Sequence, residues 1–528
     1  MTLTLLRGGH VVDGTGAPGR DADVLVRDDR VAEIGRFDDL ADAEIVDCAG
    51  LVVAPGFVDM HTHSDFTLLA DGRAESQVHQ GVTTEVVGQC GISCAPVCDH
   101  AAIPLVSPWY LRADHPHWHS FGDYLDALEA VGTGVNVLAF VGHGTVHRAV
   151  LGAELRAGAP DEVARMARLV DEAFDQGAGG FSSGLEYFPG ILAAPEHLVP
   201  MCEVAAGRGK LYATHVRNRD TQYDLGFAEA IATARQSGAR LQISHIQPKF
   251  GAPDYAMHHT LEMIEAGRRH GVDIAFDVIP HDWNHTLMAA ILPKWAQAGD
   301  LTDVLARLTD PDARARIKAN PQPMWLIVKA GKWDDIVLLN ATENRDLVGA
   351  DFAEIGRMRG IDPYDAVLDI LLEEGEHLMN CFWSSKSFRD DDIDLCLAQP
   401  GCAVISDTVA VANDGILKDQ VGSLSGYGWT ARFLQHYVRD RGVLPLEAAI
   451  AKITAVPADR LGLSDRGRLS PGARADVTVF DAASIAANCT ARHPRRYATG
   501  VAHVLVNGTF AMRDGRRQAA NAGRVLRG

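Results

Sequence analysis

A repeated alternation between short apolar runs and longer amphipathic segments constrains the fold of this chain more than any other feature. Between several of the apolar runs the helical period is clear, as in DEVARMARLVDEAFDQG at 161–177, where apolar side chains share one face and Gly177 is placed to end the helix. Strands that alternate with helices predict βα units and a parallel sheet. The apolar runs lie at 82–88, 135–142, 179–184, 210–216, 239–246, 272–280 and 402–407.

Close to eight such units would form a TIM-like (β/α)8 barrel, an α/β fold that needs roughly 250 residues or more. LVVAPGFVDMHTH, at 51–63, is interpreted as one continuous apolar strand that begins the barrel. Residues 290–350 contain four prolines and interrupt the alternation, which indicates an insertion. The predicted barrel domain is therefore 55–455, with an insertion around 290–350.

The two ends of the chain have a different sequence pattern. Short runs of alternating apolar and polar residues break there at glycine or aspartate-rich turns. This pattern covers 1–54 and returns after residue 456, up to 528. Both ends are typical of hairpins, so we expect them to pair into one small β-sandwich domain beside the barrel.

Composition and charge narrow the class of protein. The 528 residues include 49 Lys plus Arg and 69 Asp plus Glu, so the net charge is −20. That balance argues against nucleic acid or an anionic membrane as a partner. Nine cysteines, an odd number, do not indicate a disulfide framework, and no run reaches the ~18 apolar residues of a membrane span. Without a signal peptide pattern at the N-terminus, a cytoplasmic protein is expected.

Polar side chains with metal-binding or acid–base chemistry follow several of the expected strands, at the point where each strand ends. In a parallel barrel the carboxyl ends of all strands face one mouth, where the loops build the active site. Residues far apart in the sequence would therefore converge there. These side chains belong to His61, His63, Cys90, His215, His245 and Asp407.

The residue types of this set indicate a metal centre. His61 and His63 are two positions apart, so they point to the same side of an extended segment and both can reach one ion. His, Cys and Asp are the usual zinc ligands, and a thiolate at Cys90 is soft enough to bridge two cations. Any one of these histidines alone would more often be an ordinary polar residue. It is their combination that favours a metal site.

A separate structural zinc site is the alternative for Cys90, Cys94 and Cys98, which are spaced four apart in QCGISCAPVCD. Gly91 and Pro96 would break a helix there, and the spacing is not the CxxC pairing of structural zinc sites. We therefore expect Cys94 and Cys98 to be buried small side chains.

Several longer motifs occur in a fixed order and resemble one known family. They resemble the N-acyl-D-amino-acid deacylase (D-aminoacylase) branch of the amidohydrolase superfamily over nearly the whole chain. HxH is weakly specific, whereas GVTTEVVGQCG together with SSGLEYFPG is much more so. The motifs are GFVDMHTHSD, GVTTEVVGQCG, FSSGLEYFPG, ATHVRN, ISHI, ISD and DRGRLSPGARADVTVFD.

The resemblance implies a metal-bearing barrel that hydrolyses an amide C–N bond with one or two zinc ions. It implies that His61 and His63 bind one zinc, that His215 and His245 bind the other, and that Cys90 stands between them. Asp407 would be the general base that takes a proton from water and delivers it to the leaving nitrogen. Zinc would lower the pKa of bound water from 15.7 to about 7.

The substrate region departs from the family pattern. Where the family carries a lysine two residues after the ISHI histidine, this chain has Gln247, and the DVIPHDWNHT segment carries His281 and His285 where Tyr and Ser are expected. These departures put a free N-acyl-D-amino acid in question as the substrate. Tyr187 falls where the family has a pocket tyrosine, and His143 ends another strand, so both are further candidates for substrate binding.

The expected activity is therefore hydrolysis of a small-molecule amide by a D-aminoacylase-like enzyme, which could form a homo-oligomer. A hydrolase of cyclic amides such as hydantoins or lactams would use the same metal site. A non-catalytic scaffold or binding protein is the alternative of another class, and such a protein would typically have lost its ligands.

Overall fold

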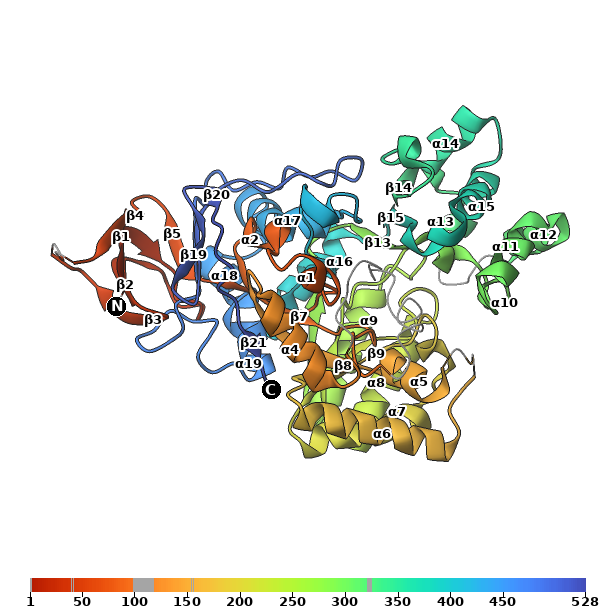
Figure 1. The fold of residues 1–528 in the computed structure, drawn as a ribbon, viewed down its shortest axis with the longest axis horizontal. Coiled ribbons are helices and arrows are strands. Elements are labelled where there is room, and N and C mark those ends of the chain that lie inside the picture. The colour runs from red at the N-terminus through yellow and green to blue at the C-terminus, as the bar shows by residue number, and fades with distance from the viewer. Residues whose placement is uncertain are drawn as a thin grey trace.

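The computed structural model describes residues 2–38, 40, 42–97, 118–152, 154, 156–320 and 325–528. Figure 1 shows a sheet from the N-terminal strands at one end, a barrel with its helices in the centre, and at the opposite end a lobe of helices that runs from α10 (Lys294–Gln297) to α15 (Pro363–Glu374). In the described part of the chain, no helix combines the length and the apolar character that crossing a membrane requires.

Eight strands form the barrel, and each neighbouring pair in their order is parallel. A parallel bridge between Thr62 and Thr408 links the first and last of these strands. The expected TIM-like barrel is confirmed. Its strands are β6 (Phe57–Asp59), β7 (Val82–Val87), β8 (Asn136–Gly142), β9 (Gly180–Gly184), β10 (Leu211–His215), β11 (Arg240–Ile243), β12 (Ile274–Val278) and β16 (Cys402–Val404).

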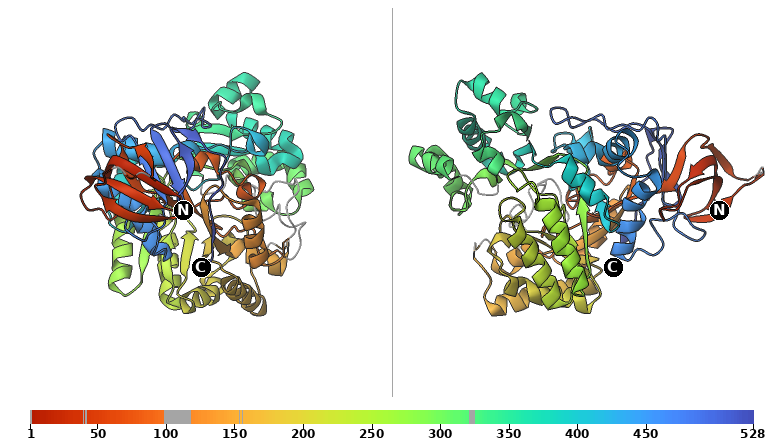
Figure 2. Two further views of the ribbon diagram at one scale, coloured as in Figure 1. Left: turned by 60° about the vertical axis from the view of Figure 1, so that its left-hand side comes forward. Right: turned by 180° about the vertical axis from the view of Figure 1, so that it is seen from behind.

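Amphipathic helices cover the outside of the barrel (Figure 2). In α6 (Pro160–Asp175) the buried side chains include Val163, Met166, Val170 and Phe174, which follow the helical period of the sequence. Burying each of them stabilises the fold by about 1.5–3 kcal/mol. Other helices of this layer include α4 (Phe121–Val131), α5 (His143–Leu151), α7 (Pro195–Gly207), α8 (Tyr223–Ser237), α9 (Ala256–Arg269), α16 (Asp390–Leu397) and α19 (Ala455–Leu461).

The two ends of the chain share one sheet, as expected. The two halves meet where β17 pairs antiparallel with β5, with Val479 opposite Val53. This sheet has its own apolar cluster, which includes Val24, Val53 and Val477. The expected barrel with a β domain built from both ends is thus confirmed. The strands are β1 (Leu3–Val11), β2 (Arg20–Arg27), β3 (Arg30–Gly35), β4 (Glu44–Asp47), β5 (Val52–Pro55), β17 (Val477–Phe480), β18 (Val501–Val506), β19 (Thr509–Arg513) and β20 (Arg516–Arg517).

The segment LVVAPGFVDMHTH is two strands, not the single strand expected from its apolar character. β5 belongs to the terminal sheet and β6 belongs to the barrel, and Gly56 lies between them. A Cβ at Gly56 would lie 2.1 Å from the Thr83 side chain, so only glycine fits at this crossing. The correction arises because both strands are fully buried, and burial gives them the same sequence pattern in either sheet.

The excursion from the barrel runs from Trp283 to Lys386 and is therefore longer than the expected 290–350. Its antiparallel sheet has the order β13 (Trp283–Leu287), β15 (Phe382–Lys386), β14 (Ile336–Asn340). The helices around it, among them α11 (Leu301–Thr309), α14 (Phe352–Arg359) and α15 (Pro363–Glu374), share a separate apolar core. This lobe lies beside the barrel on the side of β13 (Figure 1).

Candidate metal centre

The first group of donor atoms forms where β6 and β16 end. The Nε2 atom of His61 lies 3.2 Å from Cys90 Sγ and 3.3 Å from Asp407 Oδ1, and the Nε2 atom of His63 lies 3.1 Å from the same carboxylate oxygen. Ligand atoms of all four residues lie within 4.8 Å of one another. The structure therefore brings together side chains that are up to 346 positions apart in the sequence.

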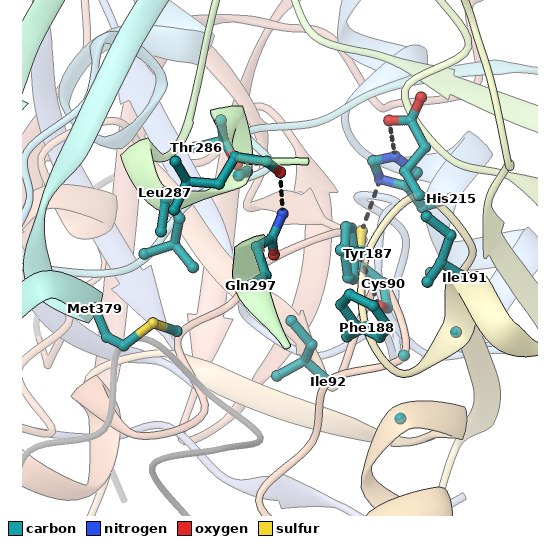
Figure 3. Close-up of a pocket in the computed structure, with 18 of the residues that line it drawn as sticks. Cys90, Ile92, Tyr187, Phe188, Ile191, His215, Thr286, Leu287, Gln297 and Met379 are labelled. Atoms are coloured by element: carbon teal, nitrogen blue, oxygen red, sulfur yellow. Dashed lines mark hydrogen bonds and ion pairs between the residues drawn. The ribbon is translucent and has the colours of Figure 1, made fainter. Parts of the chain in front are cut away.

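A second group of donors shares Cys90 with the first. Its Sγ atom lies 3.8 Å from His215 Nδ1 and 3.5 Å from His245 Nε2. Figure 3 shows Cys90 and His215 facing one another at the edge of the cavity. All six residues predicted from strand ends to form the centre thus lie together, with Cys90 between the two groups.

The donor separations fit a zinc ion. Zinc holds nitrogen, oxygen and sulfur ligands at ~2.0–2.3 Å in tetrahedral geometry, so neighbouring donors lie ~3.3–3.7 Å apart. The separations given above for the two groups run from 3.1 to 3.8 Å. Imidazole, thiolate and carboxylate are also the ligand types that zinc prefers, so these residues could hold one or two ions.

The electrostatics favour the charged forms of the two acidic ligands. Burial raises the pKa of the Cys90 thiol, but the positive field of His61 and hydrogen bonds from the other histidines outweigh burial and hold that pKa well below its usual range. The pKa of Asp407 is also held well below its usual range, since Coulombic attraction to His245 and hydrogen bonds from His61 and His63 outweigh burial. A thiolate and a carboxylate are the forms that bind a cation.

Three of these residues have backbone conformations that L side chains rarely adopt. The φ angles are +54° at Cys90, +33° at His245 and +53° at Asp407. A left-handed conformation in such residues costs about 1–3 kcal/mol each and clusters at functional sites. The turns at the ends of β7, β11 and β16 therefore carry strain that aims the side chains at the centre. No sequence pattern indicated this.

Glu186, within the motif SSGLEYFPG, is a further residue of the site. It is buried, and its Oε2 atom accepts a hydrogen bond from His215 Nε2 at 2.7 Å. Lys249 Nζ donates to both carboxylate oxygens at 2.7 Å, and its positive charge outweighs burial and holds the pKa of Glu186 well below its usual range. Because Glu186 binds Nε2, the Nδ1 atom of His215 faces Cys90. Carboxylates commonly orient metal-binding histidines in this way.

Asp277, at the end of β12, supports the loop of another donor. Its carboxylate accepts hydrogen bonds from the backbone N–H of His245 at 2.6 Å and from Gln242 Nε2 at 2.8 Å. Burial raises the pKa of Asp277 to about 6. Sequence reasoning missed Asp277 and Lys249. The position of Asp277 near a strand end was the one signal that could have singled it out.

A cavity of about 840 Å³ opens beside the donors and extends to the lobe formed by 283–386. His63, Cys90, His215 and Asp407 line its inner end. Much of the remaining wall is apolar, and Figure 3 shows several of these side chains around the space. They include Ile92, Phe188, Ile191, Leu287, Met379 and Phe382.

Two of the predicted substrate residues line this cavity. Tyr187 donates from its hydroxyl to the backbone oxygen of Cys90 at 2.8 Å, and its ring contacts His215 edge-on. His285 lies on β13, and burial lowers its pKa to about 4, which keeps the imidazole neutral near pH 7.

The other three predicted substrate residues lie away from the cavity wall. The Gln247 amide is buried against the main chain of Ile279, to which it donates at 2.6 Å. His281 lines a smaller pocket of about 250 Å³ with Arg432 and His436. His143 is buried at the start of α5, and burial lowers its pKa to about 3.

The alternative of a structural zinc site gains no support from the described residues. Cys94 is buried in the main apolar core, and in the described ranges it belongs to neither group of metal-binding side chains. Cys98 lies outside the described residues.

Comparison with known proteins agrees with this geometry. A family profile described as "Amidohydrolase family" matches residues 44–324 and 407–511, which is well over half of the chain. The chain belongs to the amidohydrolase family. It is a hydrolase that acts on carbon–nitrogen bonds other than peptide bonds, and the resemblance to D-aminoacylases is confirmed by its full-length relatives.

Two curated relatives are a D-aminoacylase and an N-acyl-D-glutamate deacylase, both from Alcaligenes xylosoxydans xylosoxydans. They are 33% and 32% identical, over 99% and 96% of this chain and 97% and 92% of their own lengths. A solved structure of N-acyl-D-glutamate deacylase from Bordetella bronchiseptica matches with a TM-score of 0.80 and 30% identity and covers 100% of both chains. That structure is a complex with zinc and a phosphonate inhibitor that mimics the tetrahedral intermediate.

Proposed function

We propose that this amidohydrolase is zinc-dependent and removes the acyl group from N-acyl-D-amino acids, with Asp407 as general base and acid. The observation that carries the proposal is the position of Asp407, whose carboxylate contacts the donor nitrogens of His61 and His63 and also lines the cavity. Two relatives that cover 99% and 96% of the chain, a D-aminoacylase and an N-acyl-D-glutamate deacylase, support this substrate class.

The chain's own residues account for the proton transfers. When bound at this centre, zinc supplies a Lewis acid that polarises a carbonyl and lowers the pKa of water. Asp407 is ionised, because its pKa is held low, so it can accept a proton from the attacking water. It then delivers this proton to the leaving nitrogen as the C–N bond breaks, and the products are a carboxylic acid and a free amine.

Tyr187 and the apolar wall are proposed to position the substrate. The Tyr187 hydroxyl is fixed by the backbone of Cys90, so its ring forms a rigid edge beside the donors. A cavity of about 840 Å³ has room for an acyl chain well beyond acetyl. A small-molecule amide with an apolar acyl group or side chain suits this shape.

The test combines metal analysis with a substrate panel. Purified enzyme is expected to hold one or two zinc ions and to hydrolyse N-acyl-D-amino acids faster than their L forms and faster than hydantoins or lactams. Asp407→Asn is expected to lower kcat by roughly 100- to 10,000-fold. Asp282→Asn is the matched control, because this carboxylate has the same side-chain exposure, 23%, and lies outside the main cavity.

Full activity of Asp407→Asn, or hydrolysis by zinc-free enzyme, would contradict the mechanism. A preference for cyclic over acyclic amides would contradict the substrate assignment and leave the metal chemistry intact.

A further inference from the structure

Arg219 is a buried arginine on the wall of the cavity. It follows β10 by four residues, and only 4% of its surface is exposed. Its Nη1 atom donates to the backbone oxygens of His245 and Gln247. The guanidinium is therefore fixed against the main chain of a residue that supplies one of the donor atoms.

Arg219 makes no direct ion pair in the described part of the chain, although its charge acts on the nearby Glu186 and helps to lower the pKa of that carboxyl. Within the described ranges, no carboxylate lies within 4.0 Å of its nitrogens, and its Nε atom is buried without a hydrogen-bond partner. Lys249 lines the same cavity but is neutralised by Glu186 at 2.7 Å. Burying a charge without a partner is costly, so a buried, unpaired guanidinium beside a cavity indicates an anionic ligand.

We propose that Arg219 is the residue that binds the substrate carboxylate, an assignment that rests on the proposed function. The site requires an N-acyl amino acid in its anionic form. Arg219 thus takes the role that the family pattern gives to a lysine at position 247. In this chain that position is Gln247, whose amide is hydrogen-bonded to the main chain of Ile279.

The hydrogen-bonding geometry of Arg219 suits a carboxylate. Nη1 is held by the main chain and Nε is buried, whereas Nη2 donates to no protein acceptor in the described part of the chain. Nη2 can therefore donate a charge-assisted hydrogen bond to a carboxylate in the cavity. The ring of Phe388 lies 5.8 Å from the guanidinium carbon and limits its movement.

The position of Arg219 also suits an amino acid carboxylate. In an N-acyl amino acid only the nitrogen and the α-carbon separate the scissile carbonyl carbon from the carboxylate carbon, so the anchor must lie next to the metal centre. Arg219 meets this condition through its bond to His245. Arg148 also lines the cavity, and its Nε atom is likewise buried without a hydrogen-bond partner. It donates to Gly152 at the end of α5, and within the described ranges it makes no hydrogen bond to a donor residue.

The experiment measures binding by calorimetry in the zinc-loaded Asp407→Asn enzyme, so that slow hydrolysis does not interfere. The ligands are N-octanoyl-D-leucine and its uncharged twin, N-octanoyl-D-leucinamide. With Arg219 present, the anion is expected to bind roughly 10- to 100-fold more tightly than the amide. Arg219→Gln should abolish this preference while the amide binds as before, and Arg219→Lys should retain part of it. Arg148→Gln is the matched control and should retain all of it.

The outcomes separate this assignment from a structural role and from the proposed function. If Arg219→Gln and Arg219→Lys still prefer the anion as strongly as the parent, the assignment is wrong. If they lose zinc, or bind both ligands equally weakly, Arg219 is structural and the assignment is also wrong. If the anion binds through Arg219 but the unsubstituted enzyme hydrolyses neither ligand, the anion site stands and the proposed function fails.

Discussion

At the scale of single residues, the site depends as much on the groups behind the donors as on the donors themselves. Glu186 fixes the ring of His215, and Asp277 fixes the backbone of His245. Both contacts are made by buried carboxylates, whose lost hydration has to be replaced by protein hydrogen bonds. Replacing either carboxylate should therefore lower the affinity of the centre for its metal.

We predict that Glu186→Gln lowers zinc affinity by roughly 10- to 100-fold, because His215 loses the acceptor that sets its tautomer and ring orientation. The measurement is zinc titration against a chelator of known affinity. Glu196→Gln, an exposed glutamate in α7, is the control and should leave the affinity unchanged. Equal affinities for all three proteins would contradict the role of Glu186.

His143 leads to a prediction about pH and stability. Its folded pKa is lowered to about 3, mainly by burial, so the folded protein binds fewer protons than the unfolded chain. Stability from this group is full above the unfolded pKa of about 6.5 and falls as pH drops toward about 3, by up to ~1.4 kcal/mol per pH unit. His143→Gln should reduce the difference in urea-unfolding free energy between pH 7 and pH 5. An unchanged difference would mean that His143 is charged when folded.

At the scale of secondary-structure elements, two features decide where the site lies and which substrates it can accept. The first is Gly56, where the chain passes from the terminal sheet into the barrel just before the donor histidines. The second is the lobe from β13 to β15, which supplies much of the apolar wall of the cavity.

Gly56→Ala is predicted to destabilise the protein by about 1–3 kcal/mol, because the new methyl group would overlap the Thr83 side chain in a fully packed region. The thermal unfolding midpoint measures this effect. Gly207→Ala in α7, where a Cβ meets nothing within 4 Å, is the control. Equal midpoints for Gly56→Ala and the parent would show that the crossing can relax.

Met379 tests the role of the lobe. It is 41% exposed and lines the cavity. Met379→Ala should lower kcat/KM for N-octanoyl substrates by roughly 5- to 30-fold, as expected for ~1–2 kcal/mol of lost apolar contact, and should spare N-acetyl substrates. Met358→Ala is the control, since Met358 is exposed on α14 and does not line the cavity. Equal losses for both acyl lengths would contradict a binding role of the lobe.

At the scale of the whole molecule, the centre joins parts of the barrel that are distant in sequence. Its donors lie at or just beyond the carboxyl ends of β6, β7, β10, β11 and β16. A metal that binds the folded protein and not the unfolded chain adds RT ln(1 + [L]/Kd) to the stability. A metal ion bound at this centre should therefore stabilise the folded barrel.

We predict that zinc at 100 times its Kd raises the free energy of unfolding by about 2.7 kcal/mol relative to the chelated enzyme. Calorimetric unfolding with and without chelator measures the shift. His61→Ala should reduce the shift. The same shift in the two proteins would mean that zinc binds somewhere else.

The sequence by itself determined the barrel, the pairing of its two ends, and the residue types of the metal centre. It could do so because buried strands, helical periods and strand-end positions are local patterns. Tertiary structure alone decided what lies around that centre. Gln247 and His281 occupy expected substrate positions but turn elsewhere, whereas Arg219, Lys249 and Glu186 meet at the cavity. Which way a loop side chain points depends on contacts with distant segments, and no local pattern encodes those contacts.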